Sequence, residues 1–387
     1  MVLGCMKKYI FISSFFLFFV CVNSLAQNFS SVLKSDSVRK VVNSVAQWQM
    51  DSFHKMNEMR VYKESSDMSW ANGVFLSDLA SWAESEHNEK QIEWYESIGR
   101  KNNYTLNDVN HRIYHADDFA VCMMYIRLYE RTGLEKVLEY TRARMDYVMH
   151  YPSKSSLEMK TENCFDRWSW ADALYMVPPT FTAMYRLSVK KEYLDFMYKE
   201  YKAAYDYLFD KKESLFYRDS NYFIKSERNG QKVFWGRGNA WVLGGLCQIL
   251  DYLPAKTSSR CFFEKLYKSM INKIVTLQDS EGYWHASMLD PESYPAPETS
   301  STGLFTYSLW WGLNQGLLDD SYRKYAEKGW KAMVKAVHPN GMLGWVQPIG
   351  ADPQKVTKDM TEVYGAGAML LAGKEILLNL KKKIEVK

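Results

Sequence analysis

The chain alternates between two kinds of helical pattern. Six segments are apolar around most of their circumference, which is typical of helices buried on most sides. They span residues 70–84, 117–133, 172–188, 237–250, 300–313 and 364–377. Six other segments carry charged residues on one face and apolar residues at i, i+3 and i+4 on the other. These span residues 35–53, 90–101, 134–149, 191–209, 260–277 and 321–337.

The alternation of the two kinds predicts an all-α fold. Six apolar helices inside six amphipathic ones bury their apolar surfaces as a closed double ring, an (α/α)6 barrel. Glycine and alanine near the starts of several inner helices allow these helices to approach closely. No linker or block of charge divides the chain after its first residues, so residues 27–387 are expected to form a single domain.

Three connections from an outer helix to the next inner helix resemble one another. They span residues 209–219, 278–290 and 338–348, and each has a polar turn followed by a short extended stretch with aromatic residues. These stretches and the starts of the inner helices should rim one end of the barrel. We expect the functional cleft at that end.

The first residues form a separate unit. Lys7 and Lys8 precede an apolar run over residues 9–22, which is followed by Ser-Leu-Ala ending at Ala26. This is the arrangement of a signal peptide, so residues 1–26 are expected to be removed and the protein exported to the periplasm or the medium. A lipid anchor at Cys21 is the alternative.

Charge and cysteine content exclude several classes of function. The chain has 49 basic and 45 acidic residues, which gives no indication of a nucleic-acid partner. Beyond the apolar run, the cysteines at positions 122, 164, 247 and 261 form no CxxC pair and are expected in the core. The sequence contains no metal-binding motif such as HExxH, so we predict no metal and no other cofactor. It implies no protein partner.

Polar residues and tryptophans stand together at the starts of four consecutive inner helices. The residues are His115, Asp117 and Asp118 at the second, Trp170 and Asp172 at the third, Trp235, Arg237, Asn239 and Trp241 at the fourth, and residues 298–302 at the fifth. Acids and hydroxyls also cap helix N-termini, which is the alternative explanation for each of them. Their repetition with interleaved tryptophans favours a binding site.

Carboxylates and a cation at one mouth suit the hydrolysis of acidic sugars. If Asp172 and one of Asp117 and Asp118 face each other, repulsion and burial raise the pKa of one of them. One carboxyl is then an acid while its neighbour stays ionised, as glycoside hydrolysis requires. Arg237 is a candidate fork for a substrate carboxylate, and a salt bridge to Asp172 or Glu298 is the alternative.

Aromatic residues, which make up 15% of the chain, are candidates for stacking on sugar rings. Trp235 and Trp241 flank Arg237, with packing in the core as the alternative. His285 and Tyr364 are further candidates for the cleft, although a structural role is the favoured explanation for each.

Four motifs, in this order along the chain, carry a resemblance. They are WSWADALYMVPP, FWGRGNAWVLGGL, ETSSTGLFTYSLWWGLNQGLL and VYGAGAMLLAGKEIL. Together they resemble glycoside hydrolase family 105, the unsaturated rhamnogalacturonyl hydrolases, and more distantly the glucuronyl hydrolases of family 88. The resemblance extends from about residue 70 to residue 378.

This resemblance implies an (α/α)6 barrel that acts on oligosaccharides ending in a 4,5-unsaturated uronic acid. In such enzymes one aspartate, here Asp172, protonates C4 and then deprotonates the water that attacks C5. The second aspartate of the family falls on Asp117 or Asp118, with Asp118 favoured. Arg237 and Trp241 match the substrate-binding arginine and tryptophan of the family.

One departure from the family pattern concerns the connection that precedes the fourth inner helix. Several members have a histidine where this chain has Arg218 or Asp219. Arg218 is therefore a candidate substrate contact of a different kind. This difference means that the family's usual subsite contacts, and its usual pectin-derived disaccharide substrate, are not assumed for this chain.

The leading interpretation is an exported hydrolase that removes an unsaturated uronic acid from lyase-generated oligosaccharides with a uronate-rhamnose linkage. Two alternatives remain open at this point. One is another α/α-barrel glycosidase, either a family 88-like unsaturated glucuronyl hydrolase or an inverting enzyme on neutral glycans that would not need Arg237. The other is a non-catalytic glycan-binding protein of the cell envelope.

Overall fold

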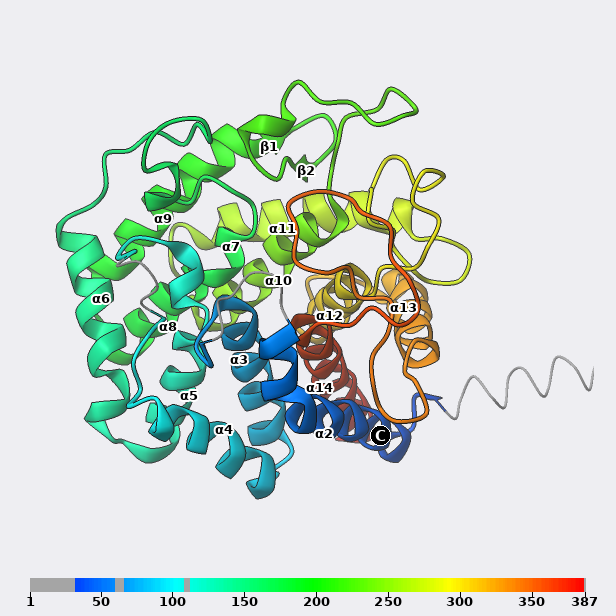
Figure 1. The fold of residues 1–387 in the computed structure, drawn as a ribbon, viewed down its shortest axis with the longest axis horizontal. Coiled ribbons are helices and arrows are strands. Elements are labelled where there is room, and N and C mark those ends of the chain that lie inside the picture. The colour runs from blue at the N-terminus through cyan, green and yellow to red at the C-terminus, as the bar shows by residue number, and fades with distance from the viewer. Residues whose placement is uncertain (1–31, 60–65, 108–111, 386–387) are drawn as a thin grey trace, which may run out of the picture.

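The helices of the protein form two concentric rings in the computed structural model, which describes residues 32–59, 66–107 and 112–385 (Figure 1). Within these residues the inner ring consists of α3 (Trp70–Ser85), α5 (Cys122–Thr132), α7 with α8 (Ala173–Met176 and Pro178–Ser188), α10 (Gly236–Tyr252), α12 (Thr299–Asn314) and α14 (Val363–Glu385). Inner helices contact one another in chain order, and α14 packs against α3, which closes the ring.

The outer ring covers the inner one with the amphipathic helices. Its described members are α2 (Ser35–Met59), α4 (Glu89–Lys101), α6 (Glu139–His150), α9 (Lys191–Leu208), α11 (Arg260–Ile274) and α13 (Arg323–Lys335). Outer helices pack on inner neighbours, for example α4 on α3, α9 on α8 and α13 on α12. The predicted (α/α)6 barrel is confirmed. The predicted signal peptide and Cys21 lie outside the described residues.

Two inner helices differ from the continuous segments that the sequence pattern predicts. The third is interrupted at Val177, because Pro178 and Pro179 lack the amide hydrogens that would continue the hydrogen-bond ladder, and they begin α8 instead. The second begins at Cys122 and is preceded by one turn of 3-10 helix, Ala116–Phe119. The 3-10 turn places Asp117 and Asp118 just before the second inner helix, at the mouth of the barrel.

Close packing inside the ring depends on small residues. A Cβ atom added at Gly245 of α10 would lie 2.3 Å from the carbonyl oxygen of Leu174, so only glycine permits this approach of α10 to α7. Among the described residues one helix, α14, is long and apolar enough to cross a membrane by length and composition, but 83% of its most apolar window is buried inside the barrel. Its hydropathy is explained by its place in the inner ring.

The connections to inner helices contain the little extended structure that the described residues form. Strand β1 (Phe209–Asp210) pairs antiparallel with β2 (Leu215–Phe216), with Phe209 opposite Phe216. In the next connection Ser287 bridges to Trp235, and in the last Val337 bridges to Leu343. These stretches lead to the starts of α10, α12 and α14 at one end of the barrel.

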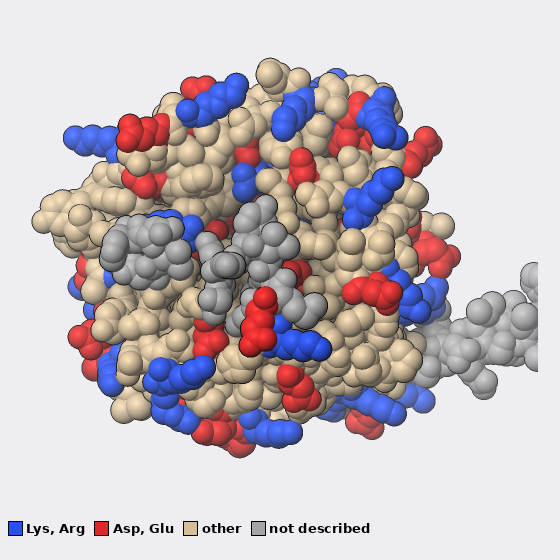
Figure 2. Space-filling view, in the orientation of Figure 1, with Lys and Arg blue, Asp and Glu red and all other residues tan. Residues whose placement is uncertain are grey.

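The surface charge and the cysteines can both be compared with the sequence predictions. On the face seen in Figure 2, lysine and arginine side chains are interspersed with aspartate and glutamate. The four described cysteines are unpaired. Cys122, Cys164 and Cys247 are buried as expected, whereas Cys261, near the start of the outer helix α11, is exposed.

A buried polar chain crosses the inside of the barrel. The hydroxyl of Tyr175 on α7 donates to Asp78 Oδ1 on α3 at 2.9 Å, and Gln248 on α10 donates to the Tyr175 hydroxyl at 2.9 Å. Asp78 is 2% exposed, and burial raises its pKa to about 8, although Tyr175 and the charges of Arg127 and Lys374 oppose the rise. Asp78 is therefore mainly a neutral acid at pH 7.

This neutral carboxyl predicts a pH dependence of stability. The folded pKa of about 8 lies above the ordinary aspartate pKa of 3.8, so the folded protein retains a proton that the unfolded chain releases. The stabilising contribution is complete below pH about 4 and is lost as pH rises toward about 8. We expect Asp78→Asn, which is neutral at every pH, to lose less thermal stability than the wild type between these pH values. Parallel melting temperatures of the two proteins across this range would contradict the assignment.

Candidate active site

A cavity of about 440 Å³ opens at the mouth where the inner helices begin. Its wall combines aromatic rings with charged side chains from the starts of the first three inner helices and from the connections. The lining residues are Ser69, Trp70, Ala71, Arg112, His115, Asp117, Phe165, Trp170, Arg218 and Ile349. The cleft that the sequence analysis expected at this end is thus a pocket with both stacking surfaces and ionisable groups.

One wall of the cavity is an aromatic cluster. The ring centroids of His115, Phe165 and Trp170 lie 5.1 to 5.2 Å from one another. Trp70, at the start of α3, also lines the cavity and stacks on Tyr364, with ring centroids 5.4 Å apart and an interplanar angle of 13°. Flat apolar faces of this kind suit the binding of a sugar ring.

His115 contributes to this wall as an uncharged ring. Its Nδ1 accepts a hydrogen bond from the backbone amide of Asp117 at 3.3 Å, which caps the 3-10 turn. Burial, together with the positive charges of Arg112 and Arg218, lowers its pKa to about 3. His115 is therefore neutral at physiological pH.

Asp172 lies at the N-terminus of α7, directly behind the cavity wall. It is 9% exposed, and its Oδ2 accepts no hydrogen bond within the described residues. Arg218 Nε lies 3.7 Å from this oxygen. Burial raises the pKa of Asp172, while the charges of Arg218 and Arg237 oppose the rise and Asp219 adds to it. The carboxyl is thus prepared to carry a proton close to the pocket.

The two consecutive aspartates at the second inner helix occupy different environments. Asp117 lines the cavity, with one fifth of its side chain exposed. Asp118 is fully buried, and its Oδ1 accepts hydrogen bonds from Arg112 at 2.8 Å and Asn107 at 3.0 Å. Burial raises the pKa of Asp118, and Arg112 opposes the rise. The geometry gives Asp118 the role of holding Arg112 and presents Asp117 to the pocket.

Arg237 is enclosed and does not line the cavity. It is 1% exposed, and its two terminal nitrogens donate to the backbone carbonyl oxygens of Gln347 at 2.5 Å and Pro348 at 2.8 Å. Its guanidinium carbon lies 4.4 Å from the centroid of the Trp235 ring and 4.8 Å from that of Tyr364. In the described structure these contacts take the place of a salt bridge to an acid. The charge of Arg237 still reaches Asp172 through space.

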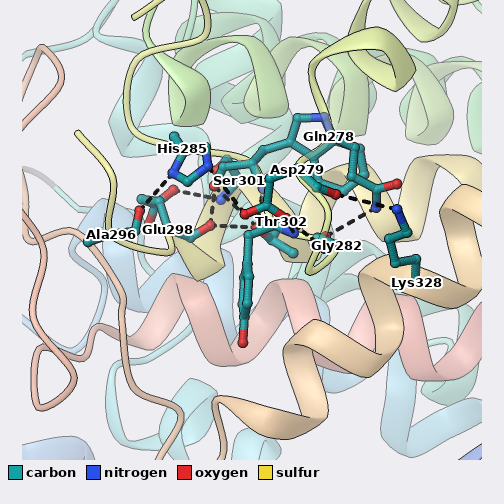
Figure 3. A network of polar contacts seen from close by, with 11 residues as sticks. Gln278, Asp279, Gly282, His285, Ala296, Glu298, Ser301, Thr302 and Lys328 are labelled. Carbon is teal, nitrogen blue, oxygen red and sulfur yellow. Dashed lines mark hydrogen bonds and ion pairs between the residues drawn. The ribbon is translucent and has the colours of Figure 1, made fainter. Parts of the chain in front are cut away.

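A buried carboxylate holds the segment that encloses Arg237. Glu298, which is fully buried, caps α12 by accepting from the amide of Ser300 at 3.1 Å. The amide of Ser301 donates to it at 2.8 Å (Figure 3). It also accepts from the amide of Gln347 at 3.1 Å. The carbonyl of Gln347 receives Arg237 and the Tyr364 hydroxyl, the latter at 2.6 Å. The cap of one helix is therefore connected to the arginine of another.

Three further candidates make structural contacts outside the cavity lining. Trp241 is buried against Tyr175, with ring centroids 4.7 Å apart. Asn239 binds both the amide and the carbonyl of Phe216 and so joins β2 to α10. His285 contacts Asp279 at 3.3 Å and the carbonyl of Ala296 at 3.0 Å (Figure 3). Their predicted contact with substrate stays a prediction.

Sequence reasoning missed several residues of the site. Trp70 was recognised as the start of an inner helix but not as a stacking surface, although an aromatic residue at that position is a usable signal. Arg112, Phe165 and Gln347 lie in connections, and their sequence context does not indicate which pocket they reach. Within the described part of the chain, no group of three or more histidine, cysteine, aspartate or glutamate residues could hold a metal ion.

A double ring of helices with an acid beside an aromatic pocket is the architecture of an α/α-barrel glycoside hydrolase. The family model described as Glycosyl Hydrolase Family 88 matches residues 41–380, so the chain belongs to this family. An Alteromonas sp. (strain LOR) protein named unsaturated 3S-rhamnoglycuronyl hydrolase is 35% identical over 357 residues, 88% of this chain and 86% of that protein. A protein of the same name from Formosa agariphila is 39% identical over 278 residues, 69% of this chain and 74% of its own.

Solved structures agree with this family assignment. A family 88 glycosyl hydrolase from Bacteroides vulgatus is 29% identical, with a TM-score of 0.78 over 89% of this chain and 99% of the other. A possible family GH105 member from Salmonella enterica is 19% identical and shares the fold, with a TM-score of 0.73 over 90% of this chain and 95% of its own. The resemblance drawn from the sequence motifs is confirmed, and the protein is a glycoside hydrolase.

The Glu298 cap provides a test of how the mouth is held together. Glu298→Ala leaves the amides of Ser300, Ser301 and Gln347 without their acceptor, and each buried unsatisfied donor costs about 1–3 kcal/mol. We expect a clearly lower melting temperature, measured by circular dichroism. The matched control is Asp319→Ala, which removes a carboxylate that caps a short helical turn at the surface. Equal melting temperatures for both variants would show that Glu298 does not hold this segment.

Proposed function

We propose that the protein removes a 4,5-unsaturated uronic acid from the non-reducing end of oligosaccharides produced by a polysaccharide lyase. The name shared by the two relatives supports rhamnose as the following sugar, and we take "3S" to denote a 3-sulfate on that rhamnose. The observation that carries the proposal is the nearly buried Asp172, which lies beside a pocket lined by aromatic rings and arginine.

The proposed reaction is hydration of the double bond by one acid that gives and then takes a proton. Asp172 donates its proton to C4, which leaves positive charge at C5 and the ring oxygen. The resulting carboxylate takes a proton from water while the hydroxide adds to C5, and Asp172 is regenerated. The hemiketal then opens by breaking the bond between C5 and the ring oxygen, which leaves a hemiacetal at C1. This hemiacetal collapses to an aldehyde and releases the next sugar as an alcohol. The raised pKa of Asp172 supports the first step, because the acid must be protonated near the working pH.

The surrounding residues support this reaction by binding and by charge. Trp70 and Trp170 offer faces on which the uronate and the following sugar would stack. Asp117 is the carboxyl that lines the cavity itself, and its exposure favours it over Asp118 as a contact for water or a sugar hydroxyl. Arg237 acts through its field on Asp172 and through the segment that it fixes.

We further propose that the enzyme works outside the cytoplasm. The positively charged start, the apolar run over residues 9–22 and the small residue at Ala26 support cleavage of residues 1–26 after export. Periplasmic fractions of the native host, probed for a chain that begins after Ala26, would test this.

Asp172→Asn tests the proposed chemistry. The amide cannot transfer a proton, so we expect turnover of an unsaturated uronyl-rhamnose disaccharide to fall at least 10²- to 10⁴-fold. Turnover is measured as the decay of the ultraviolet absorbance of the conjugated C4=C5 bond. Asp206→Asn, on the outer helix α9 with an exposed side chain, is the matched control and should retain full activity.

Other outcomes point to the alternative functions. Release of the uronate with its double bond intact would indicate direct displacement of the glycosidic oxygen. Turnover of a neutral glycoside in preference to the unsaturated uronide would indicate a different α/α-barrel glycosidase. If the wild type and Asp172→Asn both bind the disaccharide and neither turns it over, the protein is a glycan-binding protein.

A further inference from the structure

Two arginines lie near Asp172, but only one of them is part of the cavity wall. The guanidinium of Arg237 packs against the rings of Trp235 and Tyr364, and both of its terminal nitrogens donate to carbonyl oxygens. Arg218 lines the cavity. A substrate group that enters the pocket therefore meets Arg218 before it meets Arg237.

Arg218 is held rigidly and still has hydrogen-bond donors to spare. One terminal nitrogen donates to Asp219 Oδ2 at 2.6 Å, and Asp219 is itself 1% exposed and accepts from the amide of Asn221. The backbone carbonyl of Arg218 accepts from the amide of Ala171 at 2.8 Å, next to Asp172. The Nε of Arg218 has no hydrogen-bond partner among the described residues. The guanidinium is thus oriented by one acid and leaves most of its fork unused.

The charges around Arg218 leave room for an anion. Arg112, which also lines the cavity, is bound to Asp118, and His115 is neutral. Asp172 must carry a proton before it can act as an acid, and it then adds no negative charge. In that state Asp219 is the acid bonded to Arg218, and a guanidinium has five donors with which to bind a second oxyanion.

We propose that Arg218 binds an oxyanion of the substrate in this cavity and determines which acidic sugars the enzyme accepts. This inference rests on the proposed function. The shared chemistry is a planar or tetrahedral group with paired oxygens, which is either the carboxylate of the unsaturated uronate or the sulfate ester on the following sugar. In both cases the sugar rings lie against Trp170 and Trp70 while the guanidinium fork holds the acidic group.

The anion on Arg218 also affects the acid behind it. In the unliganded protein the charge of Arg218 opposes protonation of Asp172. A bound oxyanion offsets that charge, so Asp172 retains its proton more readily when the correct substrate is present. Removal of Arg218 should shift the alkaline limb of the kcat/KM profile to higher pH, because the opposing charge is lost. A residue that only supports the fold would not move this limb.

The test compares Arg218→Gln and Arg218→Lys with the wild type on the disaccharide with and without a 3-sulfate. We expect KM to rise about 10- to 100-fold in Arg218→Gln, the effect of losing hydrogen bonds to a charged group. Arg218→Lys keeps the charge without the fork and should recover part of the loss. Arg131→Gln, at an exposed ion pair on α5, is the matched control and should leave KM unchanged.

The two substrates separate the two sources of the oxyanion. A rise confined to the sulfated disaccharide assigns the sulfate ester to Arg218, and an equal rise for both assigns the uronate carboxylate. A KM within about twofold of the wild type for both substrates would overturn the proposal.

Binding to catalytically inactive protein keeps this test separate from the proposed reaction. Dissociation constants of the same disaccharides are measured by tryptophan fluorescence with Asp172→Asn and with Asp172→Asn combined with Arg218→Gln. Weaker binding by the double variant supports the role of Arg218 even if the wild type does not consume the double bond. Equal binding overturns it even if the wild type is active. Failure of the wild type to consume any unsaturated uronide counts only against the proposed function.

Discussion

The mouth of the barrel depends on a carboxylate that does not contact water. Glu298 accepts the first amides of α12 and the amide of Gln347, and the carbonyl of Gln347 in turn receives Arg237. A ring of buried helices exposes several unsatisfied amides at the same end, and each must find an acceptor inside the protein. Glu298, which accepts the amides of α12, therefore also helps to position Arg237 of α10 and the aromatic rings that pack against it. Stability and site geometry are consequences of the same contacts.

Burial and two arginines separate the ionisation of groups that lie close together. Burial lowers the pKa of His115 and raises that of Asp172, since it penalises the charged form of each. Arg218 acts in the same direction as burial on the histidine and against it on the aspartate. As a result the aromatic wall stays uncharged, and the pKa of the acid behind it lies above its ordinary value. Arg112 and Arg218 add positive charge elsewhere in the lining of the same pocket.

The sequence predicted the fold well because helix patterns are local, whereas the contacts of the site are not. All twelve amphipathic and apolar segments correspond to described helices, since each is defined by a period of 3.6 within its own residues. The break at Val177 was readable from the two prolines that follow it. In contrast, Arg237 and Asn239 resemble substrate ligands in sequence but bind backbone carbonyls of distant connections. Every residue has a backbone carbonyl, so the sequence does not indicate which carbonyl will accept a hydrogen bond. The pattern of side chains therefore could not predict these contacts of Arg237 and Asn239 with the backbone.

The family resemblance places Arg218 or Asp219 where several members have a histidine, and an arginine there would recognise different groups from a histidine. A histidine in this environment would be held neutral by burial, as His115 is, and could offer a single ring donor. Arg218 keeps its charge when buried and presents a planar fork, and Asp219 fixes the direction of that fork. A neutral donor distinguishes hydroxyl positions, whereas a fixed guanidinium distinguishes acidic from neutral sugars. An arginine at this position would therefore favour acidic sugars, and its Nε lies 3.7 Å from Asp172 Oδ2, the oxygen of the proposed acid.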